Sequence, residues 1–138
     1  MAQDNPPIRD PDAQNDRQTS VLVAEDDRAL RRFFEVVLER AGYQVFSASD
    51  GLEAMKLVLS ASIDVVVTDA MMPNLSGHEF CRFLRNSPTL SHLPIILLSA
   101  LERKGTDAAE QADAVLTKPV AGEKLIECIE ELLANKDS

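Results

Sequence analysis

The stretch DVVVTDAMMPNLSG, residues 64–77, decides the fold. Its three consecutive valines lead directly to Thr68 and Asp69. Short, continuous runs of β-branched residues are typical of strands that are buried on both faces of a parallel sheet. Pro73 and Gly77 then favour a loop. This stretch therefore predicts a buried strand that ends at an aspartate and is followed by a shaped loop.

Four other segments have the composition of strands. Val21–Ala24 and Ile95–Leu98 are continuous apolar runs, whereas Tyr43–Ser47 and Ala114–Thr117 are less apolar. Apolar residues at helical spacing lie between or after these segments: Leu30, Phe33, Phe34, Val37, Leu38 and Ala41; Ala54, Met55, Val58 and Leu59; Phe80, Phe83 and Leu84; and Leu125, Ile126, Ile129, Leu132 and Leu133. Strands that alternate with helices favour right-handed crossovers and a parallel sheet covered on both sides. We therefore predict an α/β protein with a doubly wound, five-stranded parallel sheet.

The chain divides into a short polar segment and one domain. Residues 1–18 contain three prolines, and Ile8 is their one large aliphatic residue. Such a segment cannot bury enough apolar surface to offset the entropy lost on ordering. We expect a disordered leader over residues 1–18 and a single domain over residues 19–135.

Composition and charge exclude several classes of function. Fourteen Lys and Arg residues against 23 Asp and Glu residues give a net charge of −9, which repels a polyanion. We therefore expect no direct contact with nucleic acid. No apolar run approaches the ~20 residues that span a bilayer, and no secretory signal precedes the domain. These features predict a cytoplasmic protein without membrane insertion, and the absence of a CxxC pair favours reduced cysteines at Cys81 and Cys128.

Polar residues follow the predicted strands where each one ends. Glu25 and Asp26 follow the first strand, and Asp69 ends the third. Ser99 ends the fourth strand, and Lys118 follows the fifth. In an open α/β sheet, functional residues lie beyond the carboxyl ends of the strands. The sequence therefore predicts that three acids, a hydroxyl and an ammonium group converge at one edge of the sheet.

Clustered carboxylates repel one another and raise each other's pKa unless a cation lies among them. A hard divalent cation with oxygen ligands suits such a cluster, and Mg²⁺ is the expected ion. It would also allow a phosphate donor to approach a carboxylate nucleophile, for which Asp69 is the best candidate. Lys118 and Ser99 would hold the oxygens of the transferred group.

Several other polar residues and turn residues have simpler interpretations. Asp27 and Asp50 stand directly before predicted helices and are expected to be N-caps. Gly42 is expected to end the first helix. His78 and His92 have no metal-binding partner nearby in the sequence, so we assign them no role.

Four blocks of sequence resemble the receiver domains of bacterial response regulators, the CheY-like family. They are VLVAEDDRALRR from residue 21, DVVVTDAMMPNLSG from residue 64, PIILLSA from residue 94 and LTKP from residue 116. The resemblance covers about residues 21–133 and implies a flavodoxin-like (βα)5 fold.

The resemblance also implies a role for each site residue. Glu25, Asp26 and Asp69 would bind Mg²⁺ together with the backbone carbonyl of Met71, and Asp69 would accept the phosphoryl group. Ser99 corresponds to the family's switch hydroxyl. Lys118 corresponds to its phosphate-pairing lysine, which precedes a proline that is commonly cis. A sensor histidine kinase or a histidine phosphotransfer protein would supply the phosphoryl group, and a downstream protein would respond to it. Such a protein is a switch that catalyses only its own phosphorylation and dephosphorylation.

The sequence departs from this family at three places. Val115 stands where many receivers carry an aromatic residue that turns inward on activation. Residues 101–113 are shorter than usual and have only alanines as an apolar face, which predicts a short or mobile fourth helix. Met71 and Leu101 occupy positions that tune hydrolysis in the family. Both are apolar, which predicts slow loss of the phosphoryl group.

Other functions fit less well, although one alternative stays open. The leading interpretation is a stand-alone receiver, which the polar ending Ala-Asn-Lys-Asp-Ser slightly favours. The alternative is a receiver module of a larger regulator with a separate output domain. An aspartate-nucleophile phosphatase would need a second aspartate where Met71 stands. Flavin binding would need a phosphate-binding loop where the chain has acids, and a pseudo-receiver would not need the complete set of site residues.

Overall fold

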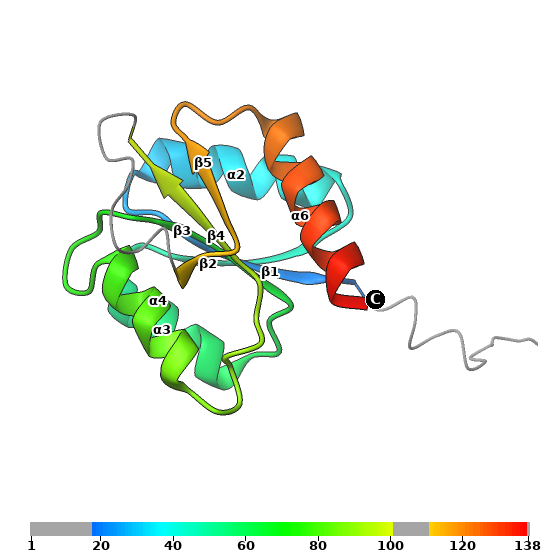
Figure 1. Cartoon of the computed structure of the whole chain (residues 1–138). Helices are drawn as coiled ribbons and strands as arrows, with labels where there is room; N and C mark the ends of the chain where they lie inside the picture. Colours follow the sequence, from blue (N-terminus) through cyan, green and yellow to red (C-terminus); the bar gives the residue numbers. More distant parts are fainter. Residues whose placement is uncertain (1–17, 101–110, 138) are drawn as a thin grey trace, which may run out of the picture.

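The computed structural model describes residues 18–100 and 111–137, which contain five strands and four helices. The strands are β1 (Ser20–Ala24), β2 (Gln44–Ala48), β3 (Val65–Asp69), β4 (Ile95–Ser99) and β5 (Ala114–Thr117). The helices are α2 (Arg28–Arg40), α3 (Gly51–Ser60), α4 (Gly77–Asn86) and α6 (Gly122–Asp137). All strand pairs are parallel, in the order β2-β1-β3-β4-β5 (Figure 1). The predicted flavodoxin-like fold is confirmed.

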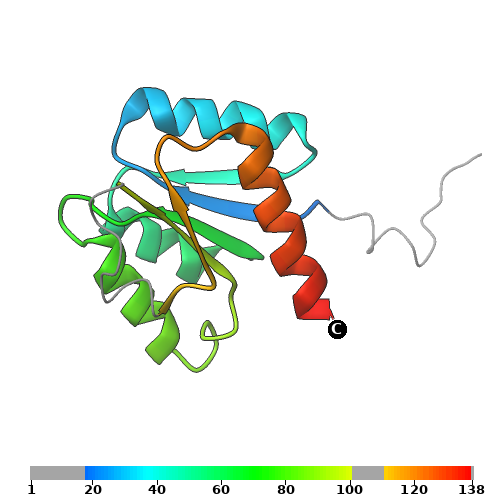
Figure 2. The ribbon, with the colours of Figure 1, turned by 45° about the horizontal axis from the view of Figure 1, so that its top comes forward.

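Helices cover both faces of the sheet. Helices α2 and α6 lie on one face, and α3 and α4 lie on the other (Figures 1 and 2). Side chains alternate between the faces along each strand, so that Val21 and Val23 pack toward α2 and α6 while Leu22 packs toward α3 and α4. Phe34 and Phe80 are the largest fully buried side chains and anchor the two faces. The continuous apolar runs in the sequence are thus explained by strands that contact a helical layer on each side.

The starts of α2 and α3 and the end of α2 follow the sequence prediction. The side chains of Asp27 and Asp50 accept hydrogen bonds from the first turns of α2 and α3. Ser76 and Glu79 form a capping box at the start of α4. Gly42 follows α2 with a φ of 99°, a backbone conformation that favours glycine. Local signals in the sequence therefore fix where these helices start and where α2 stops.

The loop between β3 and α4 packs tightly against its surroundings. A Cβ atom on Gly77 would lie 2.0 Å from the carbonyl oxygen of Asp69, and one on Gly51 would lie 2.1 Å from that of Leu75. Asn74, with a φ of 70°, donates a hydrogen bond of 2.8 Å to the carboxylate of Asp50. The backbone that follows Asp69 is therefore held by the starts of both α3 and α4.

Some predictions fall outside the described residues. The disordered leader was predicted for residues 1–18, of which only Gln18 is described, and the short fourth helix falls mainly on residues 101–110. Both stay predictions.

Within the described ranges, no helix combines the length and the hydropathy that a membrane crossing requires. Val115 lies on β5, at the edge of the sheet, and is 40% exposed.

The contact between Gly77 and Asp69 leads to a first prediction. Replacing Gly77 with alanine should lower the free energy of unfolding by about 2 kcal/mol or more, because the new methyl group collides with backbone that cannot move aside. Gly122 is the matched control, since it also begins a helix but the nearest atoms to its Cβ would be side-chain atoms of Val37, at 3.0 Å or more. Gly122→Ala should change stability by less than about 1 kcal/mol. Urea unfolding of both variants tests this, and equal losses would contradict it.

Candidate functional site

The strand register brings the predicted polar residues to one edge of the sheet. Ala24 pairs with Thr68, which places Glu25 beside Asp69. Ser99 pairs with Thr117, and the backbone amide of Lys118 donates to the carbonyl of Ser99 at 2.8 Å. The carboxyl ends of β1, β3, β4 and β5 therefore supply one site, as expected for an open parallel sheet.

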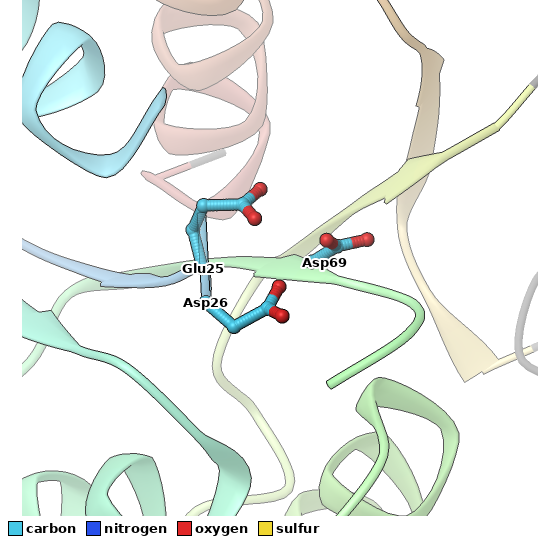
Figure 3. A group of neighbouring side chains, drawn as sticks. All are labelled: Glu25, Asp26 and Asp69. Carbon is cyan, nitrogen blue, oxygen red and sulfur yellow. The ribbon is translucent and has the colours of Figure 1, made fainter. Parts of the chain in front are cut away.

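Glu25, Asp26 and Asp69 form a cluster of carboxylates. One oxygen from each residue lies within 4.8 Å of the corresponding oxygens of the other two. Figure 3 shows Glu25 and Asp26 reaching from the end of β1 toward Asp69 at the end of β3. Glu25 is fully buried, Asp69 is 6% exposed, and Asp26 is exposed. The cluster thus has a buried interior and one side that opens to solvent.

Lys118 pairs with both buried acids. Its Nζ lies 2.8 Å from Oδ2 of Asp69, to which it donates a hydrogen bond, and 3.1 Å from Oε1 of Glu25. The ammonium group thereby reduces the cost of keeping these two carboxylates away from water. Lys118 brings one positive charge, whereas the described part of the cluster holds three carboxyl groups, so the cluster keeps an excess of negative charge.

The backbone around Glu25 is held at several points. Its amide donates to the carbonyl of Ala48 at 3.0 Å, and its carbonyl accepts from the guanidinium of Arg31 at 2.8 Å. Its Oε2 accepts from the amide of Asp27 at 3.0 Å. Its Oε1 is buried and accepts no well-oriented hydrogen bond from the described residues, despite its closeness to Lys118. Within the described residues, this oxygen therefore has an ion-pair partner but no well-oriented hydrogen bond.

The titration of the site reflects its burial. Burial, together with the charge of Asp69, raises the pKa of Glu25 from 4.5 to about 7, although the amide of Asp27 and Lys118 oppose the shift. From the sequence, repulsion between the acids is the expected cause of a raised pKa. In the structure, burial contributes more to the raised pKa of Glu25 than the charge of Asp69 does. Burial would lower the pKa of Lys118, but its hydrogen bond to Asp69 and the charges of both acids outweigh this and raise the pKa. Lys118 is thus held in its charged form.

The donor set fits a hard divalent cation. Carboxylate oxygens converge from three residues, and hard cations such as Mg²⁺ prefer oxygen ligands. The buried, unsatisfied Oε1 of Glu25 is the kind of atom that a cation or its bound water would satisfy. The solvent-facing side at Asp26 leaves room for water ligands, which Mg²⁺ usually retains.

Ser99 and Met71 lie beside the cluster. Ser99 is 2% exposed, and its hydroxyl donates to the carbonyl of Ala100 at 3.1 Å. The amide of Met71 lies 3.3 Å from Oδ1 of Asp69 and donates to it. The role of the Met71 carbonyl as a ligand stays a prediction. The bond between Lys118 and Pro119 is cis, as the resemblance implied.

The cysteines and histidines lie outside this cluster. Cys81 packs among the apolar residues between the sheet and the α3–α4 layer, where burial raises its pKa to about 11. Cys128 is also a free thiol, and burial raises its pKa as well. The reduced state expected for both cysteines agrees with these surroundings, although Cys128 is only partly buried.

Sequence reasoning missed two contacts of the site. It did not predict the bond from Arg31 to the Glu25 carbonyl or the bond from the Asp27 amide to the Glu25 carboxylate. It had assigned Asp27 only the N-cap role. One signal was available in the sequence. Arg31 lies near the start of a helix that begins just after the acids, close enough to reach back to them.

Comparisons with known proteins identify the family and agree with the fold. The family model described as the response regulator receiver domain matches residues 21–130. The response regulator MprA of Mycolicibacterium vanbaalenii is 43% identical over 118 residues, which cover 82% of this chain and 49% of MprA. The probable transcriptional regulator ycf27 of Cyanidium caldarium is 36% identical, over 87% of this chain and 48% of its own length. The chain thus spans about half the length of these curated relatives.

Solved structures are also similar. The receiver domain of a Francisella response regulator has a TM-score of 0.78 and 33% identity, over 86% of this chain and 98% of its own. The response regulator TrrA of Thermotoga maritima, solved in complex with Mg²⁺ and BeF, has a TM-score of 0.78 and 28% identity, over 84% of this chain and all of its own.

The raised pKa of Glu25 predicts how stability depends on pH without added metal. A carboxyl group whose pKa is higher in the folded protein binds its proton more tightly there, so the free energy of unfolding should fall as pH rises from about 4.5 through about 7. Glu25→Gln should match the parent near pH 4, below the ordinary pKa of 4.5, and become more stable than the parent near pH 8. Glu39→Gln removes an exposed charge from α2 and serves as the control. Urea unfolding in chelator-containing buffer tests this, and parallel pH curves for the parent and Glu25→Gln would contradict it.

Proposed function

Since this chain belongs to the response regulator receiver domain family, we propose that it is a phosphorylation switch whose acceptor is Asp69. A sensor histidine kinase or a histidine phosphotransfer protein donates the phosphoryl group in the cytoplasm, in a reaction that depends on Mg²⁺. The observation that carries this proposal is the position of Asp69, which lies between two other carboxylates and the ammonium group of Lys118.

In the proposed reaction, a carboxylate oxygen of Asp69 attacks the phosphorus atom of the phosphohistidine. The P–N bond breaks, its electron pair stays on the imidazole, and Asp69 becomes an acyl phosphate. Phosphoryl transfer requires mainly positioning and neutralisation of charge. The low exposure of Asp69 and its bonds to Lys118 and to the amide of Met71 hold the nucleophile in a defined orientation.

Glu25, Asp26 and Asp69 would hold the Mg²⁺ ion, with the carbonyl of Met71 as a fourth protein ligand. When bound, the ion supplies positive charge that lets an anionic donor approach an anionic acceptor. The oxygen-only donor set and the unsatisfied Oε1 of Glu25 support this assignment.

Lys118 and Ser99 would recognise the phosphorylated state. Lys118 already contacts Oδ2 of Asp69, so its ammonium group can pair with a phosphoryl oxygen added at that residue. The hydroxyl of Ser99 donates to its own neighbour, Ala100, and rotation about one side-chain bond would free it for a new acceptor. This exchange of partners would convert phosphorylation into movement at the end of β4.

We assign the output to a protein contact. The net charge of −9 opposes direct binding of nucleic acid by this domain. Phosphatase activity on separate substrates is disfavoured, because Met71 stands where a second catalytic acid would be needed. The protein is therefore a switch that acts only on its own phosphorylation.

A second form of this function has a specific observation in its favour. The curated relatives MprA and ycf27 are each about twice as long as the part of them that matches this chain. The domain would then work as the receiver module of a larger regulator with a separate output domain, and the chemistry at Asp69 would be the same in both cases.

The central prediction concerns phosphorylation by a small donor. With acetyl phosphate and Mg²⁺, intact mass spectrometry should show one added phosphoryl group on the parent, because the donor approaches the same acceptor oxygen. Asp69→Asn, which keeps the shape of the side chain without its nucleophilic charge, should show none, and neither should the parent with excess chelator.

An adduct of equal yield on Asp69→Asn would contradict the assignment. Asp113→Asn is a control at an acid near the opposite end of the strands, where it contacts Arg85 and the amide of Ile95. It should be phosphorylated as fully as the parent.

The lifetime of the phosphorylated state gives another prediction. Met71 is 50% exposed beside Asp69, and its thioether side chain cannot orient a water molecule for hydrolysis as a polar side chain would. Leu101, the second tuning position, lies outside the described residues. We expect the phosphorylated parent to decay over minutes or longer after the donor is removed, and Met71→Asn to decay faster. A half-life of a few seconds for the parent in Mg²⁺ buffer would contradict this.

A further inference from the structure

We propose that Arg31 is a positioning residue for the metal site, an inference that rests on the proposed function. Arg31 lies on α2 and is not itself a proposed ligand. Its guanidinium binds the backbone carbonyl of Glu25 and, among the described residues, makes no bond to the three carboxylates. It acts through the turn between β1 and α2, which carries two of the proposed ligands.

The bond from Arg31 completes the anchoring of this turn. Its guanidinium donates to the carbonyl of Glu25 at 2.8 Å in a partly buried setting. The amide of Glu25 is bound to Ala48, and one carboxylate oxygen is bound to the amide of Asp27. With Arg31 in place, Glu25 is held at its amide, its carbonyl and one carboxylate oxygen. Its Oε1 accepts no well-oriented hydrogen bond from the described residues, although the ammonium group of Lys118 lies 3.1 Å away.

Asp26 depends on this bond more than Glu25 does. The carbonyl of Glu25 belongs to the peptide unit that joins Glu25 to Asp26, so the bond from Arg31 fixes the plane from which the Asp26 side chain departs. The Asp26 carboxylate is exposed, and it accepts no hydrogen bond from the part of the protein that the structure describes. The backbone therefore sets where its Cα–Cβ bond points, and with it the range of positions that the carboxylate can reach.

The negative charge of the nearby carboxylates attracts an arginine to this place, but the position also carries electrostatic costs. A cation near the N-terminus of a helix opposes the helix dipole, and a cation near a metal site opposes the binding of another cation. Its neighbours on α2 do not share its contact. Arg32 pairs with Glu35 at 3.1 Å, and Arg28 makes no ion pair within the described ranges. Among the described residues, Arg31 thus differs from Arg28 and Arg32 in one contact, its bond to the carbonyl of Glu25 in the turn.

Arg31→Gln tests the inference, with Arg28→Gln as the matched control. Both changes remove one positive charge from the start of the same helix, and only the first removes the bond to Glu25. Isothermal titration calorimetry with Mg²⁺ should give a dissociation constant about tenfold higher for Arg31→Gln than for Arg28→Gln, as is typical when a group that orients metal ligands is lost. Arg31→Lys keeps a cationic donor and should recover part of the affinity.

A second readout separates positioning from general loss of structure. At saturating Mg²⁺, Arg31→Gln should be phosphorylated by acetyl phosphate at nearly the rate of Arg28→Gln, because the ligands are displaced and not removed. If the parent binds Mg²⁺ and the dissociation constants of the two glutamine variants lie within twofold of each other, the inference is overturned. A parent that binds no Mg²⁺ would overturn the proposed function, and this inference with it.

Discussion

The interaction on which the site depends is the pairing of Lys118 with two buried carboxylates. Glu25 and Asp69 are almost entirely removed from water, and one ammonium group lies within 3.1 Å of both. Buried carboxylates without a partner would be too costly to keep charged. With Lys118 present, the acids can stay near each other, and the remaining excess of negative charge makes the site suited to a divalent cation.

The parallel arrangement of the strands makes this pairing possible. Parallel register aligns the ends of four strands, so residues far apart in the sequence meet without any long connecting segment. The loop after Asp69 is held by close packing at Gly51 and Gly77, and the turn after β1 is held by Arg31. Rigid supports on both sides allow the acidic cluster to keep its geometry despite the repulsion within it.

Much of this arrangement could be predicted from the sequence. Continuous apolar runs give the buried strands, Asp27 and Asp50 mark helix starts, and the rule that strand ends carry function brings Glu25, Asp69 and Lys118 together. The sequence could not reveal that Arg31 reaches back to the Glu25 carbonyl, or that burial dominates the pKa of Glu25. Those features depend on side-chain conformations and on packing between distant segments, which spacing along the chain does not encode.

The most direct test of the account is a crystal structure of the protein grown with Mn²⁺, a Mg²⁺ substitute whose anomalous scattering identifies its position. One strong anomalous peak should appear among the carboxylates of Glu25, Asp26 and Asp69, with Lys118 still bound to Asp69. Absence of a peak there, or carboxylates that point away from one another, would contradict the claim that these strand ends form one cation site.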